Sequence, residues 1–202
     1  MSRSVLEFLL PKLCAFCRRP DRDGLCADCQ GKLPWRAPPD AGGVIAPLYY
    51  RDIVRFSLHR YKFRGVSGYA DVFGMLMAQA VSDSRVEAEV ATWVPCSFFR
   101  RWARGYDQSE RLARAVAKYL GLSADKLLAK QRHAKSQTKM SGDEMRRENV
   151  RGAFKVLQNP AGKRILLIDD IYTSGATLDE CRSVLLSAGA EEVICCAAAS
   201  RR

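Results

Sequence analysis

The sequence has few histidines and no long apolar stretch. Only His59 and His133 are present, and neither lies in a context that marks it as a general base. No run of apolar residues approaches membrane-spanning length. The first 13 residues contain a short apolar cluster but no small-residue cleavage site, so we expect no secretory signal. We therefore expect a cytoplasmic protein without a membrane span.

The chain also lacks the Gly-Lys-Ser/Thr sequence of a nucleotide-triphosphate loop, which excludes that class of phosphate site. Acidic residues are in deficit, and the net charge is +11. Between residues 97 and 155, nine Arg and six Lys stand against three Asp and three Glu. Such a surplus fits a polyanionic partner, either nucleic acid or a pyrophosphate group. A solvated basic surface is an equally open interpretation of this segment.

Eight cysteines in a chain without a signal sequence indicate reduced thiols or metal ligands, because cytosolic redox buffers keep disulfides open. Four of them form two Cys-x-x-Cys pairs separated by eight residues: Cys14, Cys17, Cys26 and Cys29. This spacing predicts a structural zinc site with four thiolates and no open position for a substrate. A redox dithiol is the main alternative. We expect Cys181, Cys195 and Cys196 to be core residues, and the role of Cys96 stays open.

We predict two units, a zinc-binding knuckle over residues 1–34 and a larger domain over residues 35–202. The 48% hydrophobic content suffices for a packed core. Strands are expected at 43–50, 90–95, 153–157, 164–168 and 193–199, and helices at 53–62, 72–81, 108–120 and 178–188. The final strand, helix and strand imply a right-handed βαβ unit. The predicted fold class is α/β, doubly wound, with a mainly parallel sheet.

Two adjacent acids, Asp169 and Asp170, follow the predicted strand at 164–168, where open α/β sheets bind ligands. The next residues supply hydroxyl groups and a glycine just before a helix, a combination that can surround a phosphate with main-chain N–H groups. Ionised acids only accept hydrogen bonds, which suits the two hydroxyls of a ribose. Helix capping alone would explain one acid but not this whole pattern. A receiver domain carries such a pair near its start, whereas here 32 residues follow Asp170.

The segment Ile165 to Glu180, ILLIDDIYTSGATLDE, resembles the phosphoribosyl-pyrophosphate motif of type I phosphoribosyltransferases. Further residues match the ComF competence proteins in order and spacing: Val94-Pro95, Arg100, Arg101, Arg104-Gly105-Tyr106-Asp107-Gln108, Arg132, Gln137 and RRENVRGAF from Arg146 to Phe154. With the cysteines, the resemblance covers nearly the whole chain.

The resemblance implies roles for residues of this chain. Asp169 and Asp170 would be the catalytic pair that holds the ribose hydroxyls. The 5-phosphate loop would consist of Thr173, Ser174, Gly175, Ala176 and Thr177. The pyrophosphate side would be formed by Arg100, Arg101 and Arg104, whose planar guanidinium groups suit phosphate oxygens. Mg²⁺ is implied as a cofactor that bridges pyrophosphate and ribose and is held largely by substrate and water. Residues 130–151 resemble a mobile loop that closes over the site; an ordinary basic loop is the alternative.

Three functions follow. The first is a Mg²⁺-dependent phosphoribosyltransferase, with an acceptor that the sequence does not identify. The second is a non-catalytic module for single-stranded DNA, in which Trp102, Tyr106 and Tyr119 stand among the basic residues, although we expect Tyr119 to be a core residue. The third is a zinc-stabilised scaffold with a vestigial pocket. ComF membership further implies a role in DNA uptake, with a helicase-like ATPase and other transformation proteins as partners.

Overall fold

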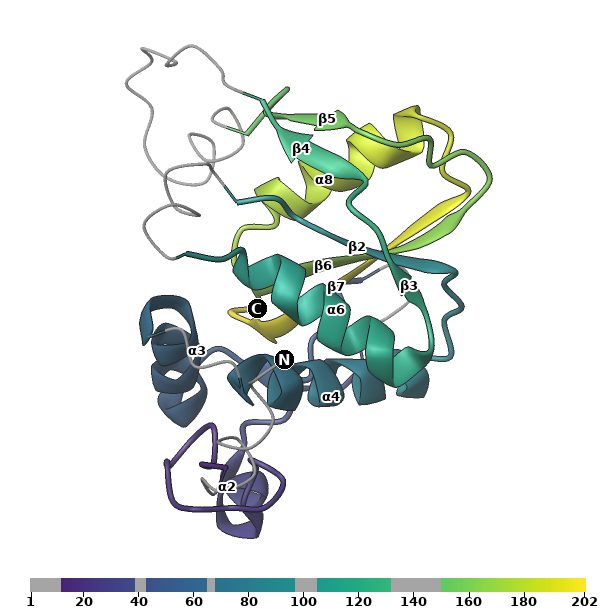
Figure 1. Cartoon of the computed structure of the whole chain (residues 1–202). Helices are drawn as coiled ribbons and strands as arrows, with labels where there is room; N and C mark the ends of the chain where they lie inside the picture. The colour runs from purple at the N-terminus through teal and green to yellow at the C-terminus, as the bar shows by residue number, and fades with distance from the viewer. Residues whose placement is uncertain (1–11, 39–42, 65–67, 97–104, 132–149) are drawn as a thin grey trace, which may run out of the picture.

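The computed structural model describes residues 12–38, 43–64, 68–96, 105–131 and 150–202. Its centre is a five-stranded parallel sheet in the order β1-β7-β6-β2-β3 (Figure 1). The strands span Leu48–Tyr49 (β1), Val90–Trp93 (β2), Ser123–Ala124 (β3), Arg164–Tyr172 (β6) and Glu192–Ser200 (β7). The α/β fold class with a mainly parallel sheet is thereby confirmed.

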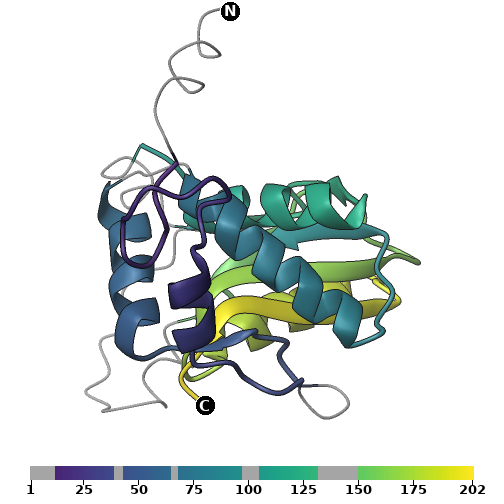
Figure 2. The ribbon, with the colours of Figure 1, turned by 90° about the horizontal axis from the view of Figure 1, so that it is seen from below.

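Helices cover both faces of this sheet. The helices of the described residues span Ala27–Lys32 (α2), Asp52–Arg64 (α3), Gly68–Asp83 (α4), Gln108–Leu120 (α6) and Ala176–Ser187 (α8). Helices α4 and α6 lie on one face, as Figure 2 shows, and α8 lies on the other, beside a small antiparallel pair formed by β4 (Leu128–Lys130) and β5 (Phe154–Val156). The structure is thus a three-layer arrangement.

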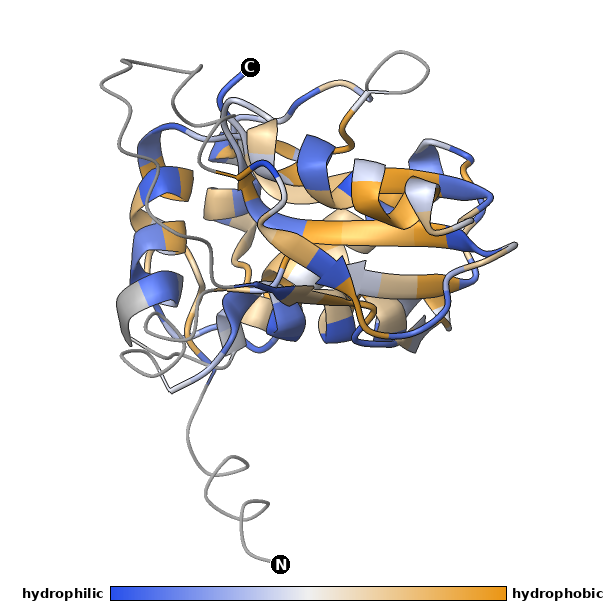
Figure 3. Ribbon diagram, turned by 90° about the horizontal axis from the view of Figure 1, so that it is seen from above, coloured by the Kyte–Doolittle hydropathy of each residue, from blue (hydrophilic) through white to orange (hydrophobic). Residues whose placement is uncertain are grey.

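The central strand β6 shows why the sequence selects this arrangement. Leu166 and Ile168 belong to the apolar cluster that includes α4 and α6, whereas Ile165 and Leu167 belong to the cluster under α8. All four are fully buried, because alternate side chains of a strand point to opposite faces. The continuous apolar run therefore needs cover on both sides, and the middle of the ribbon is correspondingly hydrophobic in Figure 3.

Helix α6 has the bounds that its sequence pattern predicts, residues 108–120. Asp107 caps its first turn by accepting from the main-chain N–H groups of Ser109 and Glu110, and Gly121 ends it in the left-handed conformation. Strand β6 differs from the prediction because it continues to Tyr172 instead of ending at Ile168. The long neighbour β7 supplies pairing partners throughout, with Asp169 opposite Ala197 and Tyr172 opposite Ser200.

The cysteine-rich segment docks on helix α3, and Figure 2 shows the two side by side. Ser57 donates to the carbonyl of Ala15 at 2.6 Å, and Arg60 donates to the same carbonyl at 3.0 Å. Phe16 packs edge-on against Phe73 of α4 at 5.6 Å between ring centres. These contacts attach the segment to the main core; the division at residue 34 stays a prediction. No helix among the described residues is long and apolar enough to cross a bilayer.

Candidate functional site

The predicted acid pair lies in the last part of β6, at the carboxyl edge of the sheet. Both side chains are half-buried. Asp169 Oδ1 accepts from the main-chain N–H of Asp170 at 2.8 Å and from the Ser109 hydroxyl at 3.1 Å. The two oxygens of Asp170 lie 3.0 and 2.9 Å from Lys62 Nζ, on helix α3. The structure therefore brings α3, α6 and β6 together around the two acids.

The local environment favours the neutral form of Asp169. Burial raises the pKa of Asp169 from its usual 3.8 to about 7, and the charge of Asp170 acts in the same direction. The hydrogen bond from the Asp170 N–H, the charge of Lys62 and the Ser109 hydroxyl oppose this rise in pKa. This carboxyl therefore changes charge near neutral pH, where it can act as either an acceptor or a donor of hydrogen bonds.

The predicted phosphate loop connects β6 to α8. Gly175 has φ +88°, a left-handed conformation, and a Cβ at this position would lie 3.0 Å from the Tyr172 ring. Gly175 is also the N-cap of α8, and within the described part of the chain no side chain caps this end of the helix. The first N–H groups of a helix without a cap need partners, and together with the helix dipole they favour an anion. The loop geometry is thus suited to a phosphate.

The opposite side of the acid pair is formed by the connection from β2 to α6. The main-chain N–H of Val94 donates to the Ile168 carbonyl at 3.0 Å, which holds the end of β2 beside β6. Cys96 donates its N–H to Asp107 Oδ2 at 3.1 Å, so the same acid that caps α6 also fixes this turn. Residues 97–104 lie outside the described residues, and with them Arg100, Arg101 and Arg104 of the predicted pyrophosphate side.

Two residues of the site were missed from the sequence. The sequence pattern predicts Lys62 at the end of a short helix over residues 53–62, with no sign that it reaches the acids. Ser109 lies in the first turn of α6. Their partners are 108 and 60 positions away in the chain, so no local pattern could indicate these contacts.

The prediction for the aromatic residues needs a correction as well. Tyr119 is 43% exposed and not a core residue, because it lies near the exposed end of an amphipathic helix beside Lys118. Trp102 and nearly all of the predicted closing loop, residues 132–149, lie outside the described residues.

The four cysteines of the N-terminal pairs form a compact cluster. Their sulfur atoms all lie within 4.8 Å of one another, and the sulfurs of Cys17 and Cys26 are 3.6 Å apart. Tetrahedral coordination with Zn–S bonds of about 2.3 Å requires sulfur atoms about 3.8 Å apart. Two of the four residues, Cys14 and Cys29, are buried, which fits a closed shell. The geometry therefore fits a four-thiolate metal site, and we call Cys14–Cys29 the cysteine knuckle.

The surroundings of the four thiols shift their pKa values in different directions. Burial disfavours the thiolate of Cys14, but main-chain N–H groups of Cys17, Cys26 and Phe16 outweigh it and lower its pKa to about 7. Burial and the neighbouring thiols raise the pKa of Cys29. Four thiolates so close together repel one another unless a cation is present, whereas the amides already point at the sulfur of Cys14. A divalent cation would remove this repulsion.

One family model and several known proteins are similar to this chain. Residues 107–202 match the family model described as phosphoribosyl transferase domain, a region that begins at the cap of α6 and contains the acid pair and the loop. The chain is 24% identical to competence protein F of Haemophilus influenzae, over 95% of this chain and 91% of that protein. It is 27% identical to competence protein ComFC of Bacillus subtilis, over 93% and 77% of the two chains. The chain is thus similar to the ComF competence proteins over more than nine tenths of its length.

DNA utilization protein YhgH of Salmonella typhi is another relative, with 27% identity over 90% of this chain and 87% of that protein. Among solved structures, an allosteric regulatory enzyme of purine biosynthesis gives a TM-score of 0.47 with 24% identity, over 69% of this chain. Glutamine phosphoribosylpyrophosphate amidotransferase from B. subtilis gives 0.43 with 28% identity, over 61% of this chain. The present chain covers only 30% and 24% of these two longer chains.

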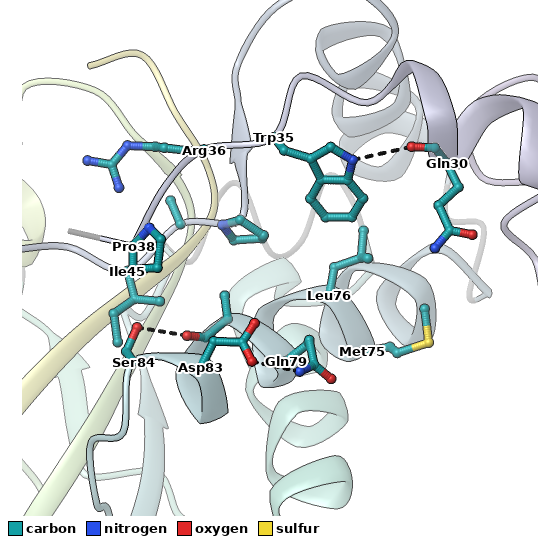
Figure 4. Close-up of a pocket in the computed structure, with 13 residues that line it drawn as sticks. Gln30, Trp35, Arg36, Pro38, Ile45, Met75, Leu76, Gln79, Asp83 and Ser84 are labelled. Carbon is teal, nitrogen blue, oxygen red and sulfur yellow. Dashed lines mark hydrogen bonds between the residues drawn. The ribbon is translucent and has the colours of Figure 1, made fainter.

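A pocket of about 300 Å³ lies elsewhere in the structure, between the segment after the knuckle and helix α4 (Figure 4). Trp35 forms one wall, fixed by a bond from its indole N–H to the Gln30 carbonyl at 3.3 Å. The opposite wall comes from the second half of α4, including Leu76 and Asp83. None of the lining residues belongs to the predicted sugar-phosphate site, so the two locations are distinct.

Proposed function

We propose that the carboxyl edge of the sheet binds phosphoribosyl pyrophosphate or a nucleotide through its ribose 5-phosphate. The observation that carries this proposal is the N-terminus of α8, which no side chain of the described residues caps and which follows shortly after a half-buried acid pair. The terminus offers N–H donors to an anion, and the carboxylates offer acceptors to hydroxyl groups. A ligand with a phosphate at one end and vicinal hydroxyls beside it uses both. The match to the phosphoribosyl transferase domain supports this choice.

In this proposal the residues from Thr173 to Thr177 bind the 5-phosphate, and Asp169 and Asp170 bind the ribose hydroxyls. Arg100, Arg101 and Arg104 bind pyrophosphate, and Mg²⁺ supplies further positive charge when bound. The corresponding reaction is a glycosyl transfer: the bond from the anomeric carbon to pyrophosphate breaks, and a bond to the acceptor forms. Cationic groups stabilise the departing pyrophosphate. The chain would then be a Mg²⁺-dependent phosphoribosyltransferase.

Calorimetry with phosphoribosyl pyrophosphate and Mg²⁺ tests the binding step. We expect the unaltered protein to bind and the double variant Asp169→Asn/Asp170→Asn to lose binding, because amides are poorer acceptors for two hydroxyls. Asp52→Asn is the matched control, since its carboxylate is 74% exposed on α3 and away from the acid pair. Absence of binding by the unaltered protein would refute the proposal. Equal binding by the double variant would show that the phosphate and not the ribose determines affinity.

We also propose that the cysteine knuckle holds a structural Zn²⁺. The sulfur spacing and the amides directed at Cys14 support this assignment. Four thiolates fill a tetrahedral shell, so the ion would have a structural role and no open position for chemistry. Native mass spectrometry of the protein expressed with zinc should show one ion per chain, lost in a Cys14→Ser/Cys17→Ser variant. A metal-free chain of unchanged stability would exclude the site.

A second candidate function is the handling of single-stranded DNA during DNA uptake. It is favoured by a row of three arginines over three tyrosines at the ends of β1, β7 and β6. The distances from guanidinium carbon to ring centre are 5.1 Å for Arg51 and Tyr49, 5.0 Å for Arg201 and Tyr50, and 5.9 Å for Arg202 and Tyr172. We call these six residues the tyrosine–arginine row. Cations and aromatic rings together suit the phosphates and bases of a single strand.

The row follows the same edge of the sheet as the predicted phosphate loop. The N–H of Arg201 donates to the Tyr172 carbonyl at 2.9 Å, and that of Tyr50 donates to the Ser200 carbonyl. Two relatives are named competence proteins and a third is named a DNA utilization protein. In this function the chain would act in the cytoplasm during natural transformation, together with a helicase-like ATPase and other transformation proteins.

Binding of a single-stranded oligonucleotide, measured over a series of salt concentrations, tests this candidate. We expect affinity to fall with salt, with a logarithmic slope of about −0.7 for each phosphate contact. Arg51→Gln/Arg201→Gln should weaken binding and flatten this slope. The matched control Arg85→Gln/Lys163→Gln removes the same charge from the opposite edge of the sheet and should change it less. Equal effects of the two double variants would indicate general charge attraction and exclude the row.

A further inference from the structure

Lys62 lies unusually close to the acid pair for a lysine that belongs to none of the sequence motifs. Its Nζ contacts both oxygens of Asp170, at 3.0 and 2.9 Å. The side chain of Lys62 is 21% exposed and that of Asp170 is 16% exposed. An exposed lysine pair contributes little because water screens it, but this pair is largely removed from water. The contact calls for a functional explanation, because Lys62 pairs with one of the two acids that are predicted to bind the ribose.

The position of Lys62 is fixed by the residues directly before it on α3. Arg60 donates to the carbonyls of Ala15 and Phe16 in the cysteine knuckle, at 3.0 and 2.6 Å. Tyr61 is fully buried, and its hydroxyl donates to the Gln108 carbonyl in α6 at 2.7 Å. Three successive residues thus attach α3 to the knuckle, to α6 and to β6. Lys62 is held at the acids by a rigid support and not by a flexible surface contact.

The charges around the pair show what Lys62 does there. Among the described residues, Tyr61 on α3, Cys181 on α8 and Cys195 on β7 interact electrostatically with the acids. Arg111 on α6 and Asp107 at its N-cap act on Tyr61. Arg111 lies over the ring of Tyr106, 4.0 Å from its centre. Among the groups whose contacts are described, Lys62 is the cation that pairs with the acids. Two carboxylates side by side repel each other, and a fixed ammonium offsets that repulsion.

We propose that Lys62 is a positioning residue for the sugar site: it holds the Asp170 carboxylate in place through contacts to both of its oxygens, so that the acid pair can accept hydrogen bonds from a ribose. The identity of the ligand in this proposal rests on the proposed function. The contact between Lys62 and Asp170 does not depend on that function. Lys62 acts as a permanent counter-cation for the acids. It lies outside the region that matches the phosphoribosyl transferase domain, which begins at residue 107. The ammonium leaves lone pairs of Asp170 available, because each carboxylate oxygen can accept more than one hydrogen bond.

The test uses the full chain with three substitutions. Lys62→Met removes the charge but keeps the length of the side chain, and Lys62→Arg restores the charge. Lys118→Met is the matched control, because this lysine pairs with Asp71 at 3.5 Å on the exposed side of α6. The first readout is the carboxyl ¹³C titration of Asp169 by NMR. The second readout is the affinity for phosphoribosyl pyrophosphate with Mg²⁺ at constant pH.

We expect Lys62→Met to raise the titration midpoint of Asp169 by about one pH unit, because a nearby positive charge is lost. It should also weaken ligand binding about tenfold, whereas Lys62→Arg recovers most of both effects and Lys118→Met changes neither. An unchanged Asp169 titration in Lys62→Met would overturn the proposal, and so would a shifted titration with unchanged affinity. If the unaltered protein does not bind the ligand, the proposed function fails, while the titration still decides whether Lys62 controls the charge of the acids.

Discussion

Replacing Asp169 by asparagine should make the protein more stable while it removes one of the two acids proposed to bind a ribose. Asparagine is uncharged at every pH, and its Oδ1 can still accept from the Asp170 N–H and the Ser109 hydroxyl. The ionised carboxylate, by contrast, is held where burial and the charge of Asp170 disfavour it. The substitution thus keeps the two hydrogen bonds and removes an unfavourable charge, so its effect on stability must depend on pH.

The magnitude follows from the pKa of Asp169, which is about 7 in the folded chain against an ordinary value of 3.8. Because the folded pKa is raised, the folded state binds the proton more tightly, and stability falls as pH rises from about 4 to about 7. At about 1.4 kcal/mol per pH unit, the ionised carboxylate costs about 4 kcal/mol above neutral pH. The advantage of the asparagine variant should therefore grow by about 2 kcal/mol between roughly pH 5.5 and 8.5.

Urea denaturation at several pH values across this range measures the difference in unfolding free energy. A constant offset between the two proteins would reflect only the change of hydrogen-bonding groups, so the slope with pH is the informative quantity. Asp52→Asn should show no such slope, because its carboxylate is exposed. A pH-independent difference, or a variant that is less stable at high pH, would refute the reasoning that the fold disfavours the Asp169 carboxylate.

Three further substitutions test the loop, the helix packing and the knuckle. Gly175→Ala should cost about 1–3 kcal/mol and weaken phosphate binding, because alanine is strained at φ +88° and its Cβ would meet Tyr172; thermal unfolding and phosphate titration measure the two effects. Gly74→Ala should cost about 1–3 kcal/mol of unfolding free energy, because its Cβ would lie 2.4 Å from that of Ala115, but phosphate affinity should not change. Arg60→Met should speed the release of zinc to a chelator, followed by a colorimetric zinc indicator, because two bonds to knuckle carbonyls are lost.

Local patterns in the sequence predicted the elements near the site well. Helix α6 begins after a capping aspartate and ends at a left-handed glycine, so both of its ends are encoded within a few residues. The apolar run of β6 identified a strand covered on both faces, and the spacing of the cysteines predicted the cluster of sulfur atoms. In each case the information lies in neighbouring residues, where propensity and periodicity are informative.

Features that depend on distant partners could not be predicted in the same way. Strand β6 extends to Tyr172 only because β7 continues beside it. The short strands β3 and β4 have two and three residues, too few to show a periodic pattern. Lys62 meets Asp170 across 108 positions, so that contact is set by how α3 is anchored. The amphipathic pattern of α6 likewise did not reveal that Tyr119 lies on the exposed side.

The environment of the acid pair depends both on local sequence patterns and on contacts with distant residues. Extension of β6 buries Asp169 and raises its pKa, while helix α3 supplies an ammonium that offsets part of the repulsion between the two acids. For stability alone, an amide at position 169 would serve better, because it would keep the hydrogen bonds without the buried charge. Ribose hydroxyls supply a chemical reason for an acid at this position, since an ionised carboxylate is the stronger acceptor for them. The loss of stability and the proposed ribose binding therefore have the same physical origin, the partly desolvated carboxylate of Asp169.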